Sequence, residues 1–159
     1  MSVVAAAVLN RPATPVVLPA RVLRPTKTKV GIVLVVSRAN RRLTMYSEER
    51  RIRGFDVAVG TAAYPTPRGI FHVIQKQKNP TWSPPDSPWA AGLGPIPPGP
   101  GNPLGTRWIG TSAPAIGIHG TYADWSVGTA ASHGCLRMHI SDVEWLYNYV
   151  RIGTVVRIV

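Results

Sequence analysis

The sequence predicts a mainly β fold with one short helix at about residues 142–151 and a long loop at about 77–107. Short apolar runs with alternating polar residues recur from Val30 onward and return at the C-terminus, which is typical of strands joined in antiparallel hairpins. Residues 77–107 contain nine prolines and five glycines, which exclude a helix or a central strand there. Only the segment near the C-terminus has apolar residues at a well-marked helical spacing.

The chain has 159 residues, enough for one domain with a hydrophobic core. Residues 1–28 carry four prolines among short Val and Leu pairs, so we expect a linker with one edge strand there. The apolar start, Met1–Leu9, lacks a cationic leader and is not predicted to be a signal peptide. The longest apolar run, Val30–Val36, is seven residues, far short of the roughly 20 that span a bilayer. No membrane span is therefore expected.

Alternating apolar residues place the strands. Leu43 and Met45 alternate within one strand, and Phe55, Val57 and Val59 share one face of another. The expected strands lie at 30–36, around 43–45, from 55 to 59, at 70–74 after a Pro-Thr-Pro-Arg-Gly turn, and at 154–159.

The predicted helix has its own start and stop signals. Ser141–Glu144 matches a capping box, and Gly153 ends the helix before the final strand. Its expected apolar face consists of Val143, Leu146, Tyr147 and Val150.

The loop at 77–107 is expected to form a wall of an active site, because loops of this length inside a compact domain are usually functional. Trp82, Trp89 and, just beyond the loop, Trp108 are its aromatic residues. Two roles remain open for each: lining a groove or pinning the loop to the body of the domain.

The charge balance favours an anionic partner. Eighteen Lys and Arg against seven Asp and Glu give a net charge of +11 and a pI near 10.9. Zinc-finger spacing, heptads after a basic region and ribonucleoprotein motifs are all missing, so we predict no nucleic-acid binding. An anionic wall or membrane surface fits equally well. The clusters at Arg38–Arg42 and Arg50–Arg53 are also explained by a solvated face.

Three histidines and the only cysteine fall within 21 positions, at His119, His133, Cys135 and His139. A thiol becomes a good nucleophile when an imidazole takes its proton, and His119 and His133 are both candidates. Backbone amides around Gly134 and Cys135 are candidates for an oxyanion hole. Composition alone leaves a buried structural cysteine about equally plausible.

Two other interpretations compete with a thiol enzyme. The same four side chains are permissible zinc ligands, but their spacing lacks the close pairs of structural zinc sites, so no metal is predicted. A binding module that uses its positive charge on a polyanion, with a degenerate cysteine region, is the second. The intact run Ser132–Arg137 argues against such decay.

The cysteine region resembles the L,D-transpeptidase catalytic domain, also called the YkuD-like family. The family signature is an upstream histidine and, farther along the chain, a run of Ser or Thr, His, Gly, Cys, an aliphatic residue and Arg or Asn. Here twelve residues separate His119 from Ser132. The resemblance covers about residue 29 to the end and implies a mixed β-sandwich, with residues 1–28 as a possible remnant of a preceding wall-binding module. The agreeing stretches are Gly117–Thr121, Ser132–Met138, Leu43–Tyr46, Val59–Gly60, Tyr64–Gly69, Asn79–Trp82 and Gly99–Trp108.

The resemblance implies a peptidoglycan L,D-transpeptidase. Cys135 would attack the bond between the diamino acid and the terminal D-alanine of a tetrapeptide stem, release D-alanine and pass the acyl group to an amine of a second stem, giving a 3→3 cross-link. His119 would be the base, and the main-chain carbonyl of Gly120 would orient its ring. A carboxypeptidase or an amidase of the same fold is the alternative.

The resemblance also implies the surroundings of this chemistry. His133 would complete the catalytic group, while Ser132 and Gly134 would support the turn. Tyr64, Trp82 and Trp108 would bind substrate, and Arg137 would either buttress the motif or meet the carboxylate of the stem. No cofactor and no metal are required. The expected partners are peptidoglycan stem peptides and, as inhibitors, β-lactams of the carbapenem class. We expect a monomer that acts outside the cytoplasm, at the cell wall or in the periplasm, with an export signal outside this chain.

Overall fold

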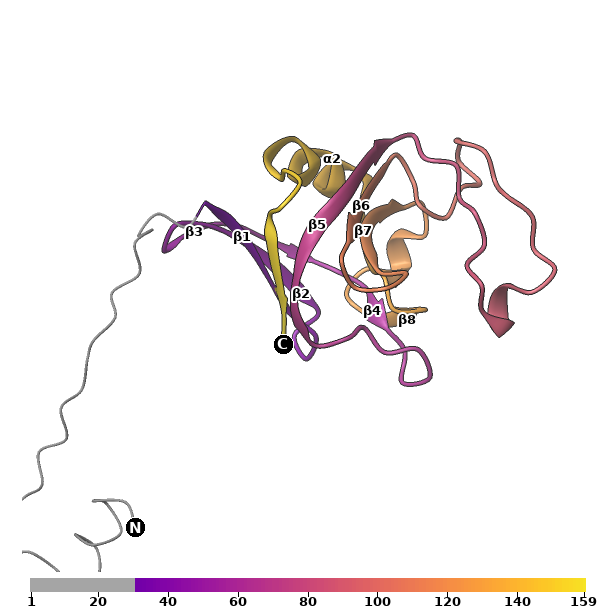
Figure 1. The fold of residues 1–159 in the computed structure, drawn as a ribbon, viewed down its shortest axis with the longest axis horizontal. Coiled ribbons are helices and arrows are strands. Elements are labelled where there is room, and N and C mark those ends of the chain that lie inside the picture. Colours follow the sequence, from indigo (N-terminus) through magenta and orange to yellow (C-terminus); the bar gives the residue numbers. More distant parts are fainter. Residues whose placement is uncertain (1–30) are drawn as a thin grey trace, which may run out of the picture.

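The computed structural model describes residues 31–159, so the linker expected at 1–28 lies outside the described part. Eight strands form one sheet in the order β3-β2-β1-β10-β5-β6-β7-β9, and β4 pairs with β8 in a small second sheet (Figure 1). The mainly β prediction is confirmed. The strands are β1 Ile32–Ser37, β2 Arg42–Ser47, β3 Arg50–Asp56, β4 Val59–Gly60, β5 Gly69–Lys78, β6 Arg107–Thr111, β7 Gly117–Thr121, β8 Ala130–Ser132, β9 Leu136–His139 and β10 Val155–Ile158.

One hydrophobic core joins the two halves of the large sheet. The β1–β2–β3 meander supplies fully buried side chains such as Leu34 and Leu43. Ile118 of β7 and Leu136 of β9 belong to the same buried cluster, although their strands lie at the other end of the sheet. Burying apolar faces from both halves against each other stabilises the sandwich arrangement expected from the sequence.

The strand expected at 55–59 is divided in two. β3 ends at Asp56, and Val59 opens β4 instead of continuing β3. The reason is a tertiary contact, because the Ala58 N–H donates to the carbonyl of Arg137 at 2.9 Å. The chain therefore leaves the meander here and crosses to β9, beside the cysteine.

β5 is longer than the expected 70–74 strand and serves both halves of the sheet. Its first part pairs with β10, and its second part, from Val73 to Lys78, pairs with β6. Val73 is fully buried, whereas Ile70 and Ile74 point outward and are 67% and 59% exposed. The apolar run therefore predicted a strand correctly, but only part of it enters the core.

The helix α2 spans Ile140–Tyr149 and begins two residues earlier than expected. The predicted capping box is wrong, because His139 occupies the N-cap position and no side chain caps the helix. β9 runs directly into α2, so Ser141 is already inside the first turn. Asp142 instead pairs with Arg53 at 2.9 Å. Val143 and Leu146 are buried as predicted and fix α2 on the sheet.

The proline-rich loop between β5 and β6 extends away from the sheet (Figure 1). Its only regular piece is the 3₁₀ turn η1, Pro88–Ala90. Asn102, 1% exposed, organises its base: Nδ2 lies 2.8 Å from the Pro80 carbonyl and 3.0 Å from that of Ile96, and Oδ1 accepts the Leu104 N–H at 2.8 Å. The loop is thus held from within. No helix of the described residues is long and apolar enough to cross a membrane.

Candidate active site

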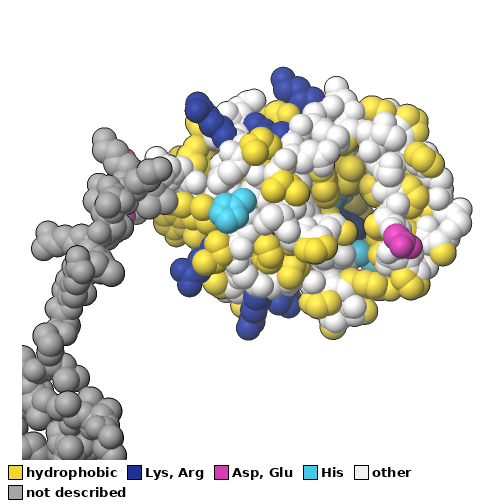
Figure 2. All heavy atoms as spheres, in the orientation of Figure 1, with side chains coloured by type: hydrophobic (Ala, Val, Ile, Leu, Met, Phe, Trp, Pro, Cys, Tyr) yellow, Lys and Arg dark blue, Asp and Glu magenta, His cyan; other side chains and the backbone are white. Residues whose placement is uncertain are grey.

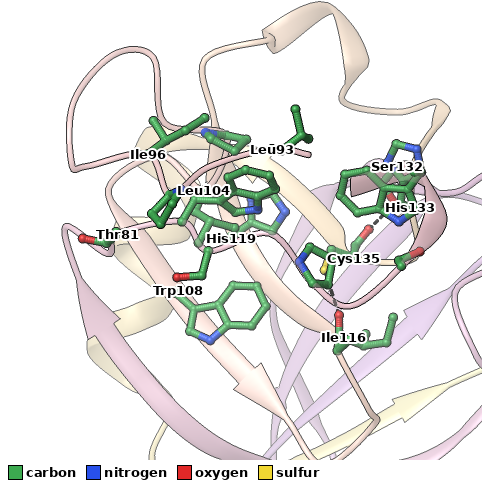
Figure 3. A pocket seen from close by; sticks show the side chains of 18 of the residues that line it. Thr81, Leu93, Ile96, Leu104, Trp108, Ile116, His119, Ser132, His133 and Cys135 are labelled. Carbon is green, nitrogen blue, oxygen red and sulfur yellow. Dashed lines mark hydrogen bonds between the residues drawn. The ribbon is translucent and has the colours of Figure 1, made fainter. Parts of the chain in front are cut away.

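A cavity of about 1170 Å³ is lined by this loop, by His119 of β7 and by the turn that carries Cys135. The labelled loop residues Thr81, Ile96 and Leu104 lie across the cavity from His133 (Figure 3). The surface is hollowed on the face seen in Figure 2, where histidine and basic side chains are visible inside the hollow. The loop is therefore a wall of the cavity, as the sequence predicted.

Cys135 lies in a tight turn between β8 and β9, and Gly134 makes that turn possible. Gly134 has a φ of +112°, which side-chain-bearing residues rarely adopt. A Cβ at this position would lie 2.7 Å from Cδ1 of Ile116. Only glycine fits here without strain, and the thiol that follows opens into the cavity.

Two buried hydroxyl groups hold the turn in place. The Ser132 hydroxyl accepts the Gly134 N–H at 3.1 Å and donates to the Cys135 carbonyl at 2.6 Å. Thr66 approaches from the other side: its Oγ1 donates to the Gly134 carbonyl at 2.7 Å and accepts the Gly60 N–H at 2.8 Å. These hydrogen bonds satisfy the polar groups of the turn. They therefore restrict where the thiol can lie.

The Gly134–Ser132 bond narrows the choice of oxyanion donor. The Gly134 N–H, one of the two amides expected to bind the oxyanion, is already donated to Ser132. The Cys135 N–H has no hydrogen-bond partner among the described residues. Gly134 therefore shapes the turn, and Cys135 itself has the available amide.

His119 lies in the buried strand β7 and is 4% exposed. Its Nδ1 lies 2.7 Å from the carbonyl oxygen of Gly120, the partner that the sequence predicted. A carbonyl can only accept, so Nδ1 carries the proton and Nε2 of the neutral ring has the lone pair. Burial lowers the pKa of His119 to about 4; the Gly120 bond raises it, and the charge of Arg137 lowers it further. The ring is thus neutral at pH 7 and able to accept a proton.

Cys135 is in its thiol form. Burial raises the pKa of the thiol, although a backbone hydrogen bond from Gly117 and the positive charge of Arg137 lower it. The Sγ donates to the carbonyl of Ala115 at 3.5 Å. Both shifts favour the uncharged forms, so the thiol and the imidazole line one cavity in their neutral states and the sulfur needs a proton acceptor to attack.

His133 differs from His119 in its surroundings. Its ring stacks on Trp89 with centroids 4.0 Å apart and an angle of 9°, and it meets the edge of Tyr64 at 4.9 Å. The sequence therefore placed His133 in the right cavity, but its described contacts are aromatic. Trp89, for which the sequence left open lining a groove or pinning the loop, lines the cavity and stacks on His133.

The four expected substrate-binding residues all line the cavity, in different settings: Arg137, Tyr64, Trp82 and Trp108. Trp108 is the least free of them, because its Nε1 donates to Gln75 at 3.1 Å and its ring covers Gly117, where a Cβ would lie 2.3 Å from the ring. Its ring centroid is 6.0 Å from that of His119. Trp108 therefore forms the floor beside the base.

Comparison with known proteins identifies the fold and the signature together. A model of the family described as the L,D-transpeptidase catalytic domain, YkuD, matches residues 31–158. The chain belongs to this family. The protein named L,D-transpeptidase YkuD from Bacillus licheniformis is 35% identical over 125 residues, which are 79% of this chain and 64% of that protein.

Solved L,D-transpeptidases share the fold. One from Mycobacterium smegmatis has a TM-score of 0.67 at 18% identity and covers 80% of this chain and 58% of that one. L,D-transpeptidase 3 from Mycobacterium tuberculosis, in complex with a faropenem-derived adduct, has a TM-score of 0.65 at 21% identity and covers 80% and 60%. The chain spans less than two thirds of the length of the first curated relatives it matches.

The zinc interpretation finds no support in the arrangement of this L,D-transpeptidase domain. Within residues 31–159, no three His, Cys, Asp or Glu side chains gather where they can hold a metal ion. His139 points elsewhere, because its Nδ1 lies 2.8 Å from Asp124 outside the cavity lining. Of the four donors that lie close along the chain, His139 is thus outside the cavity that the other three line.

Sequence reasoning missed two residues of the L,D-transpeptidase site, Thr66 and Ala115. Thr66 lies in the Pro-Thr-Pro turn and reaches Gly134, 68 positions away. Ala115 has a φ of +57°, and its carbonyl accepts the Cys135 thiol. The Pro-Thr-Pro spacing was visible in the sequence, but nothing in Ala115 as a residue type marks it.

Proposed function

We propose that residues 29–159 form the catalytic domain of a peptidoglycan L,D-transpeptidase that acts outside the cytoplasm through Cys135. The observation that carries the proposal is that the Cys135 thiol and the neutral ring of His119 line one cavity, while the bond from Nδ1 to Gly120 leaves Nε2 as the proton acceptor. The family membership supports the reaction class.

In the first step, Cys135 Sγ attacks the carbonyl carbon between the diamino acid and the terminal D-alanine of a tetrapeptide stem. His119 accepts the thiol proton as the C–S bond forms. The Cys135 N–H is the amide available to stabilise the oxyanion of the tetrahedral intermediate. His119 then donates its proton to the leaving nitrogen, and D-alanine departs from a thioester.

In the second step, an amine of another stem attacks the thioester. The C–N bond forms, the C–S bond breaks, and the proton of the amine returns to the sulfur through His119. The product is a 3→3 cross-link. Arg137 is the only arginine or lysine among the lining residues, so we assign it the carboxylate of the donor stem.

Hydrolysis of the same thioester defines the second candidate function. Water as the acceptor gives a carboxypeptidase, and an amidase of this fold would release anchored protein by the same chemistry. The cavity, with a volume of about 1170 Å³, has room for water or for the amine of a second stem as the acceptor. We also propose β-lactams of the carbapenem class as inhibitors, because a strained lactam carbonyl suits a thiol with a base; a solved L,D-transpeptidase in complex with imipenem supports this.

Incubation of the protein with tetrapeptide muropeptide, followed by mass spectrometry, tests the proposal. We expect a dimer formed with loss of D-alanine, and no turnover by Cys135→Ala or His119→Gln. His72→Gln is the matched control, because His72 is exposed and lies outside the cavity lining. An unchanged muropeptide with folded protein would contradict the proposal, and tripeptide without dimer would favour the carboxypeptidase.

A further inference from the structure

The walls of the cavity carry opposite charges. Asp86, on the loop, is the only carboxylate among the lining residues, and Arg137, on β9, is the only arginine or lysine. An acidic group is visible beside the hollow in Figure 2. In a chain with eighteen basic and seven acidic residues, a carboxylate facing the cavity needs a reason.

Asp86 is exposed and belongs to no ion pair within residues 31–159. Most other acidic side chains of the described part have a partner. The paired ones are Asp56 with Arg42, Asp142 with Arg53, Glu144 with Arg107 and Asp124 with His139. The charge of Asp86 is therefore available to a ligand in the cavity.

Two indole rings accompany this carboxylate. Trp82 precedes and Trp89 follows Asp86 along the sequence of the loop, and the centroids of the two indole rings are 6.4 Å apart. Trp82 is fixed by paired backbone bonds with Ile96, both 2.9 Å, and Trp89 by its stack on His133. Aromatic faces attract cations, and an adjacent carboxylate adds to the attraction. Together the three side chains have the chemistry of an ammonium subsite.

We propose that Asp86, with Trp82 and Trp89, forms the subsite that receives the ammonium group of the acceptor stem. The inference rests on the proposed function, in which the acyl group is held on Cys135 and the acceptor brings an amine. Arg137 binds the carboxylate of the donor from the opposite wall, so the two charges set the direction in which each stem enters.

The reaction balances without a further reagent. The ammonium gives one proton to solvent near Asp86 and becomes a free amine. Its nitrogen attacks the thioester carbon, the C–N bond forms and the C–S bond breaks. The second proton passes to His119 and from there to the sulfur, which restores the thiol. Asp86 takes no part in these transfers; it raises the concentration of the acceptor stem beside the thioester and so favours aminolysis over hydrolysis.

The test measures how the acyl-enzyme divides between amine and water, as the ratio of dimer to hydrolysed tripeptide formed from tetrapeptide muropeptide. We expect Asp86→Asn to lower this ratio about fivefold, the size of a single exposed or partly desolvated ion pair, and Asp86→Arg to lower it more. Asp86→Glu should retain most of it. Added salt should shrink the difference between wild type and Asp86→Asn.

Glu48→Gln is the matched control, because Glu48 is an exposed carboxylate in the turn after β2, outside the cavity lining. An unchanged ratio in both Asp86→Asn and Asp86→Arg would overturn the inference. So would a wild-type protein that is acylated but forms only tripeptide. A wild-type protein that forms no acyl-enzyme contradicts the proposed function itself, so the two failures are distinguishable.

Discussion

The ring of His119 is bound to the residue that follows it: Nδ1 lies 2.7 Å from the carbonyl oxygen of Gly120. This bond assigns the ring proton to Nδ1 and leaves Nε2 as the base. Because the partner is a main-chain atom of β7, the orientation of the base depends on the strand and not on a second side chain. The expected consequences run from this histidine to the cysteine turn and the loop.

Protonation of His119 should not slow acylation by a carbapenem until the pH approaches about 4. Burial lowers the His119 pKa to about 4, so the ring is neutral and active as a base above that value. The rate of mass gain on the intact protein, followed from pH 7 downward, measures this. An acidic limb near the ordinary histidine pKa of 6.5 would contradict it.

The same shift makes a stability prediction. The unfolded chain binds a proton at His119 near pH 6.5, and the folded chain only near about 4. Between these values the unfolded state holds more protons, so the contribution of this residue to stability is present above pH 6.5 and is lost as the pH falls through the window. The difference between the denaturant midpoints of wild type and His119→Gln should therefore shrink as the pH falls toward 4.

Thr66→Val should destabilise the cysteine turn. It removes the buried hydroxyl that links the Gly60 N–H to the Gly134 carbonyl, at a cost of about 1–3 kcal/mol in the free energy of unfolding. Acylation of Cys135 should slow in parallel, because the turn loses its outer support. Thr66→Ser keeps the hydroxyl and is the control. Equal denaturation curves for wild type and Thr66→Val would rule out this role.

Gly134→Ala should impair acylation through two separable effects. The residue needs a φ of +112°, and the new Cβ lies 2.7 Å from Cδ1 of Ile116. The strain alone costs roughly 1–3 kcal/mol. Gly128→Ala provides the strain without the clash, because Gly128 has a φ of +83° and open space around it. Combining Gly134→Ala with Ile116→Val should restore part of the loss; no restoration would argue against the clash.

Asn102→Ala should loosen the loop and weaken substrate binding more than it slows chemistry. Its buried amide contacts the Pro80 carbonyl and accepts the Leu104 N–H at the base of the loop, and each of these groups left without a partner costs about 1–3 kcal/mol. We expect a raised KM for muropeptide with a smaller change in kcat. Asn148→Ala, an exposed asparagine of α2, is the control. A change confined to kcat would refute the role.

Much of the fold was predictable because it depends on local pattern. The alternation at Leu43 and Met45 and the apolar face of Val143 and Leu146 report burial directly, and both pairs are buried. The start of α2 was not predictable from Ser141–Glu144, since β9 enters the helix without a break. The split near Ala58 depends on a bond to Arg137, 79 positions later in the chain, which no local window contains.

By itself the sequence determined that residues 77–107 form neither a helix nor a central strand, and its resemblance to the L,D-transpeptidase signature predicted Cys135 as the nucleophile, His119 as the base and the Gly120 carbonyl as its partner. These predictions depend on residue type and on the order of neighbours along the chain. Only the tertiary structure decided the contacts of the His133 ring and of the Gly134 N–H. The ring stacks on Trp89 and the N–H is donated to Ser132, and such contacts depend on distant strands and loops being folded together. The protonation states likewise come from burial, which no single residue encodes.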